Sequence, residues 1–94
     1  MRIEPVEIYS DRTNAAIMRH PGRNFPGIVV QGDTLYLLSS RADWLCKTLR
    51  EEIDSEAYGE LNHLRNALQG FLTHYKETLL AHEMRLPFSE QEPL

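Results

Sequence analysis

The chain has 94 residues, of which 41% are hydrophobic and 26% charged, a balance typical of one small globular domain. Its single cysteine excludes an internal disulfide and a cysteine-based metal site, and its net charge of −4 argues against a nucleic-acid-binding protein. No apolar run reaches the roughly 18–20 residues of a membrane-spanning helix, and no secretion signal opens the chain, so we expect a cytoplasmic location.

Charge is unevenly distributed along the chain. Residues 1–50 carry a net charge of +2, whereas residues 51–94 carry −6. The acidic second half disfavours binding to a phosphate backbone, and it suits a surface that binds a basic protein.

The first quarter of the chain predicts two strands and a loop. Residues 3–9 alternate apolar and acidic side chains as a strand does, and Pro5 places that strand at a sheet edge. The two alanines of residues 15–19 favour a helix, but the run is short and ends before a proline, so we interpret it as a strand. Two Pro-Gly steps in residues 21–27 then predict a structured loop.

The segment after this loop has two interpretations. Residues 28–31 are rich in β-branched side chains and predict a strand. Gly32-Asp33 then fits a type II′ hairpin turn that leads into a further strand at 34–38. Alternatively, Asp33 begins a helix that continues through Leu49. We favour the hairpin, because Ser40 and Asp43 have the spacing of a capping box and mark a later helix start.

Two helices are predicted in the second half, at about 41–53 and 56–82. The apolar stripe of the first contains Ala42, Leu45, Cys46, Leu49 and Ile53. That of the second has heptad-like spacing and contains Ala57, Leu61, Leu64, Leu68, Phe71, Tyr75, Leu79 and His82. A break at Gly70 would divide the second helix into two shorter ones.

The predicted fold is α+β, with a small antiparallel sheet of three or four strands covered on one face by two C-terminal helices. Residues 1–86 form its single domain, and residues 87–94 form a loose polar tail.

The segment 14–35 contains Arg19-His20-Pro21-Gly22-Arg23-Asn24-Phe25-Pro26-Gly27, followed by Gln31-Gly32-Asp33. It resembles a family of small uncharacterised bacterial proteins that share this Arg-x-Pro-Gly-Arg-x-Phe-Pro-Gly core. The resemblance implies a bacterial origin and no assigned activity.

One candidate ligand site lies in this motif. Arg19, His20 and Arg23 on a rigid loop would bind a carboxylate or phosphate group. Gln31 and Asp33 at the following turn would add polar contacts. The alternative is structural: the glycines and prolines make turns, and the arginines pair with the acidic second half.

The sequence contains no recognisable catalytic or metal-binding motif. The four histidines do not have metal-ligand spacing, and the segment after His82 does not match the zinc-protease motif. Cys46 falls on an inner helix stripe and suits a buried apolar role. The sequence therefore predicts no catalytic residues, no metal and no cofactor, and it favours a protein that is not an enzyme.

The long second helix gives the leading functional hypothesis. Its length exceeds the width of a small sheet, so part of it is available for a second copy of the chain. The interface of that homodimer would contain Leu61, Leu64, Leu68, Phe71, Tyr75 and Leu79. We expect a protein-interaction module, with an inhibitor or immunity-type role as one form of it. A small-ligand module that uses the Arg19–Arg23 loop is the alternative.

Overall fold

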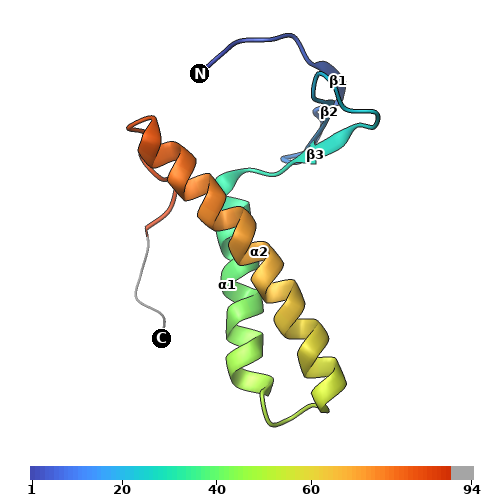
Figure 1. Ribbon diagram of the computed structural model, residues 1–94, viewed down its shortest axis with the longest axis vertical. Helices are drawn as coiled ribbons and strands as arrows, with labels where there is room; N and C mark the ends of the chain where they lie inside the picture. Colours follow the sequence, from blue (N-terminus) through green and yellow to red (C-terminus); the bar gives the residue numbers. More distant parts are fainter. Residues whose placement is uncertain (90–94) are drawn as a thin grey trace. The chain divides into compact units, whose positions relative to one another are not determined.

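The computed structural model describes residues 1–89. Three strands followed by two helices confirm the predicted α+β class (Figure 1). The chain divides into two compact units, a sheet unit of residues Met1–Gln31 and a helical hairpin that begins at Gly32. Neither helix in the described part of the chain is long and apolar enough to cross a membrane. The expected covering of the sheet by the helices stays a prediction.

The sheet unit contains β1 (Glu7–Ser10), β2 (Ala16–Arg19) and β3 (Gly27–Val29), which are antiparallel and adjacent in chain order. The structure therefore confirms the strand interpretation of residues 15–19. A β-bulge at Tyr9 shifts the register of β1 against β2. Each strand is short, and the loops between them carry the turn residues that the sequence indicated.

Pairing in the sheet places charged residues on one face. Glu7 lies opposite Arg19, and Ile17 lies opposite Ile28 on the same face. The other face is apolar and contains Ile8, Ala16, Met18 and Val29. No residue of the three strands is fully buried, and Ile8 and Ile28 are 60% and 61% exposed. The sheet unit has little core of its own.

The first helix, α1, spans Gly32–Leu49, so the predicted hairpin turn and fourth strand are wrong. The alternative, a helix through Leu49, holds instead. This longer helix is favoured because inward-facing positions recur at three- and four-residue intervals from before residue 40. These positions include the buried residues Ser39, Ala42 and Cys46. Asp43 is consequently not a capping residue but lies within the helix.

Gly32 permits a close approach between the helices. A Cβ atom at this position would overlap the ring of Tyr75. The glycine that resembled a hairpin turn in the sequence is therefore required by a tertiary contact with a residue 43 positions away.

The second helix, α2, spans Ser55–Ala81 and passes through Gly70 without a break. Its N-cap is Asp54, whose Oδ1 accepts a hydrogen bond of 2.8 Å from the backbone N–H of Ala57. Its C-cap is His82, followed by Glu83 with a φ of 56°, and the N–H of Met84 donates to the carbonyl of Leu79 at 2.9 Å. This is a Schellman ending, with glutamate where glycine is usual.

The two helices pack against each other along their length (Figure 1). Cys46 is only 1% exposed, and its Sγ donates to the carbonyl of Leu61 at 3.7 Å. Leu72 is buried on the α2 side of the same seam. The described part of the predicted tail includes Phe88, which stacks on Tyr36 with ring centroids 4.3 Å apart. Residues 90–94 of that tail lie outside the described residues.

Candidate functional site

A tight turn joins β2 to the β2–β3 loop. The N–H of Arg23 donates to the carbonyl of His20 at 3.1 Å, and Gly22 between them has a φ of 85°. Proline at the second position and a positive φ at the third are the features of a type II turn. The turn therefore fixes the backbone that carries His20 and Arg23.

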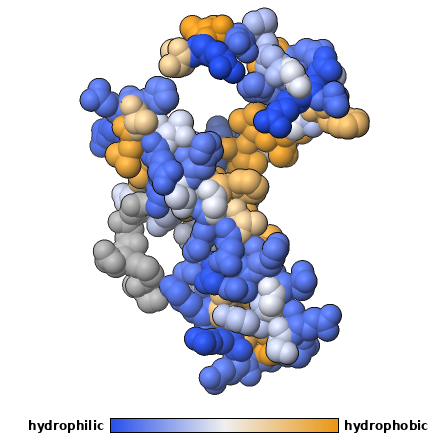
Figure 2. Space-filling model, viewed as in Figure 1, coloured by the Kyte–Doolittle hydropathy of each residue, from blue (hydrophilic) through white to orange (hydrophobic). Residues whose placement is uncertain are grey.

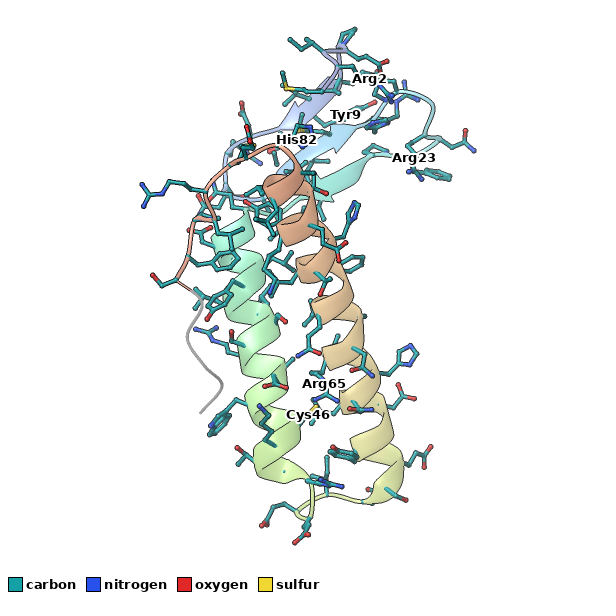
Figure 3. All side chains as sticks on the ribbon, turned by 60° about the vertical axis from the view of Figure 1, so that its left-hand side comes forward. Arg2, Tyr9, Arg23, Cys46, Arg65 and His82 are labelled. Carbon is teal, nitrogen blue, oxygen red and sulfur yellow. The ribbon has the colours of Figure 1, made fainter. Side chains whose placement is uncertain are left out.

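A pocket of about 380 Å³ lies beside this turn, and we call it the turn pocket. Its lining consists of Pro5, Glu7, Arg19, His20, Pro21, Gly22, Arg23 and Asn24. Three of the predicted ligand residues thus share one pocket, and Arg23 extends from the β2–β3 loop (Figure 3).

The other two predicted ligand residues do not line the turn pocket. Gln31 is the last residue of the sheet unit, after β3. Asp33 belongs to the first turn of α1, where its Oδ1 accepts a 2.9 Å hydrogen bond from the N–H of Thr34. Their grouping depended on a hairpin turn that the structure replaces with a helix.

The two arginines of the pocket differ in their partners. Arg19 pairs with Glu7 on the adjacent strand, through both Nε and Nη2. Its partner thus lies within the sheet and not in the acidic second half. The guanidinium of Arg23 has no ion pair or hydrogen bond within residues 1–89.

The ring of His20 is held by the backbone of the next residue. Its Nδ1 lies 2.8 Å from the carbonyl oxygen of Pro21. Because a carbonyl oxygen only accepts hydrogen bonds, Nδ1 carries a proton, and Nε2 stays available to a ligand. Asn24 adds an amide group to the same lining.

A second candidate surface lies on the helical hairpin, whose two sides differ. On the polar side, Asp43 accepts hydrogen bonds from Lys47 at 2.8 Å and from Arg65 at 3.2 Å. Arg65 also donates to Asn62 and Asn66. The bond from Lys47, followed by that from Arg65, lowers the pKa of Asp43 below 3.8, although partial burial opposes the shift.

The Asp43–Arg65 pair establishes which flanks of the two helices lie on the same side, and Figure 3 labels Arg65 on α2. Successive residues are about 100° apart around a helix axis. The flank of α1 opposite Asp43 carries Leu38 and Leu45, and the flank of α2 opposite Arg65 and Asn62 carries Leu64 and Phe71. The four residues Leu38, Leu45, Leu64 and Phe71 therefore lie together, and we call this surface the apolar side of the hairpin.

The apolar side is open to solvent. Its four side chains are 42%, 37%, 54% and 65% exposed, in the order Leu38, Leu45, Leu64, Phe71. On the outer surface of α1, Leu37 and Trp44 are also exposed. By contrast, the turn between the helices and the start of α2 present mainly hydrophilic residues in Figure 2.

The six predicted interface residues divide between two environments. Leu61, Leu68, Tyr75 and Leu79 are half-buried, and the ring of Tyr75 lies against Gly32 of α1. Leu64 and Phe71 lie outside the seam, on the apolar side. The sequence analysis missed Leu38 and assigned Leu45 to the inner stripe of the first helix. The seven-residue interval between these two leucines indicates that they share one face of a helix.

Metal binding and the environment of Cys46 are the remaining points that the described residues address. Within residues 1–89 no group of three or more His, Cys, Asp or Glu is arranged to hold a metal ion. Cys46 is buried in the seam, as its place on the inner stripe predicted.

One family model matches most of the chain. Residues 1–88 match the model of a family of unknown function, DUF6959, and the chain belongs to this family. No curated protein and no solved structure matches the chain.

Proposed function

We propose that the protein is a non-catalytic interaction module in which the apolar side of the helical hairpin binds the same side of a second copy. The exposure of Leu38, Leu45, Leu64 and Phe71 on one side carries this proposal. Large apolar surfaces that are open to solvent mark sites of protein association.

The limited core of the hairpin supports association. Among its described residues only Ala42, Cys46 and Leu72 are buried hydrophobic residues. A chain of this length buries a small fraction of its surface, and oligomerisation is a common way to complete such a core. Contact between two apolar sides would bury the side chains that one hairpin leaves exposed.

A second copy is the partner that fits this surface best. From Leu64 to Phe71 on α2, the apolar side contains Ala67 between the two large residues and no charged one. On α1 the exposed Arg41 lies between Leu38 and Leu45 on the same flank, so it is the α2 part that is complementary to itself, as the isologous interface of a twofold dimer requires. The resulting assembly would be a four-helix bundle with the polar sides outside.

The length of α2 also favours this arrangement. Its 27 residues extend about 40 Å, whereas the 18 residues of α1 extend about 27 Å. The surplus length gives a second hairpin further helix surface to pack against.

Light scattering after size-exclusion chromatography, at two protein concentrations, tests the proposal. We expect a mass near twice 10.9 kDa for the native chain. Phe71→Glu should shift the mass toward the monomer, because it places a charge in the centre of the apolar side. Thr73→Glu is the matched control, since it adds the same charge to an exposed position of the same helix and should leave the dimer intact.

Two results would contradict the proposal. One is a monomeric mass for the native chain at both concentrations. The other is an equal loss of dimer in both variants, which would show that charge alone, irrespective of its side, causes dissociation. Circular dichroism of each variant verifies that the helices are still folded.

A further inference from the structure

We propose that the turn pocket binds the carboxylate group of a small organic acid. This site belongs to the sheet unit and is independent of the proposed helical interface. Its volume of about 380 Å³ is at the small end of the range for ligand pockets.

The first argument is preorganisation. The hydrogen bond from Arg23 to His20 and the positive φ of Gly22 hold the turn in one conformation. Arg19 is held by Glu7, its partner on the adjacent strand. A ligand would therefore meet polar groups whose backbone is already ordered, which lowers the entropic cost of binding.

The second argument is charge. The positive charge of Arg19 is matched by Glu7, whereas the guanidinium of Arg23 has no partner in the described part of the chain. The charges of Arg19, Arg23 and Glu7 leave the lining with a net charge of +1. A ligand with one negative charge neutralises this pocket, and a second negative charge would be repelled by Glu7.

The third argument is the chemistry of the lining. A guanidinium presents parallel N–H groups that match the two oxygens of a carboxylate. Gly22 and Asn24 also line the pocket, and their backbone N–H groups have no hydrogen-bond partner within residues 1–89, so each can donate to a ligand that it faces. Pro5 and Pro21 give the lining apolar surfaces for the body of the acid.

Titrations of the full chain with acetate, benzoate and inorganic phosphate, followed by NMR at constant ionic strength, test the proposal. We expect saturable shifts of the Gly22, Arg23 and Asn24 amides with both carboxylates. Benzoate should bind more tightly than acetate, because its ring contacts the proline surfaces, and phosphate should bind more weakly than either.

Substitutions identify the residues responsible. Arg23→Gln should weaken benzoate binding at least tenfold, whereas Arg23→Lys should retain part of the affinity. Arg12→Gln is the matched control, because it removes another exposed arginine of the sheet unit that does not line the pocket. Glu7→Gln should shift the preference toward phosphate by removing the negative charge from the lining.

Three results would overturn the proposal. They are the absence of saturable shifts with benzoate, unchanged benzoate affinity in Arg23→Gln, and equal affinities for acetate, benzoate and phosphate. The last result would indicate an unspecific attraction of anions. The mass of the protein is measured under the same conditions, so failure of this site is distinguished from failure of the helical dimer.

Discussion

The sheet unit and the helical hairpin are held together by different interactions. In the hairpin, Ser39, Ala42, Cys46 and Leu72 are buried between two helices. In the sheet unit no strand residue is fully buried, and order depends on cross-strand hydrogen bonds, one turn and the Glu7–Arg19 pair. We therefore expect side-chain packing to control the stability of the hairpin and backbone conformation to control that of the sheet unit.

Removal of a buried side chain should give the largest effect. Leu72→Ala leaves a cavity in the seam and should lower the free energy of unfolding by about 3 kcal/mol. Urea denaturation measures this change, and hydrogen exchange should show faster exchange in α1 and α2 than in the native chain. Leu80→Ala is the control, because Leu80 is exposed and its truncation should change stability little. Equal effects of the two substitutions would contradict the assigned core.

A pair of glycine substitutions tests the contact between α1 and Tyr75. Gly32→Ala should destabilise the hairpin by about 1–3 kcal/mol, because the added methyl group overlaps the tyrosine ring. Gly70→Ala should instead stabilise it by up to about 1 kcal/mol, since the space around Gly70 is open and alanine favours a helix. Thermal unfolding followed by circular dichroism compares the two variants. A stabilising Gly32→Ala would show that the close approach does not exist.

A substitution in the His20–Arg23 turn tests the role of backbone conformation in the sheet unit. Gly22→Ala should cost the sheet unit about 1–2 kcal/mol, because an alanine at a φ of 85° is strained. Hydrogen exchange should increase in β2 and β3 and stay unchanged in the helices. Gly27→Ala, where φ is not positive and space is open, should have little effect. Increased exchange in both units would contradict their independence.

The Schellman ending of α2 offers a smaller, stabilising change. Glu83→Gly should raise the free energy of unfolding by about 0.5–1 kcal/mol, because glycine adopts a φ of 56° without strain. Urea denaturation measures the gain. Glu77→Gly, within the helix, should have the opposite sign. A loss of stability in Glu83→Gly would argue against the left-handed ending.

Acid should weaken the polar side of the hairpin, by at most about 1 kcal/mol for a partly exposed pair. The folded state lowers the pKa of Asp43 below its ordinary 3.8, so this contribution is fully present above pH 3.8. It is lost as the pH falls through the lowered pKa. Urea denaturation between pH 7 and pH 2 should therefore show a smaller loss in Asp43→Asn than in the native chain. Asp11→Asn, in an exposed loop, should retain the native pH dependence.

Local patterns in the sequence predicted much of the fold. The long helix α2 followed from its apolar spacing. The His20–Arg23 turn followed from Pro-Gly chemistry, and the structure places Arg19, His20 and Arg23 in one pocket. These features depend on residues that are close in sequence, so local physical rules suffice for them.

The errors involve contacts between distant residues. In the sequence Gly32 resembles a turn glycine, and only the structure shows that the ring of Tyr75 lies against it. Heptad spacing in α2 identified both Leu68 and Phe71, but it does not state which of them faces α1 and which faces outward. Arg19 likewise required the strand register before Glu7 was evident as its partner.

The edge positions of β1 and β3 have a consequence for association. Within the described residues both strands have one side without a neighbouring strand, and such edges invite pairing with other chains. Here β3 has three residues and follows Pro26 directly, while β1 is bent by the bulge at Tyr9 and follows Pro5 closely. Short, bent and proline-flanked edges are poor templates for strand addition. We therefore expect the sheet edges to resist strand addition, which leaves the helices as the surface through which we propose that the chain assembles.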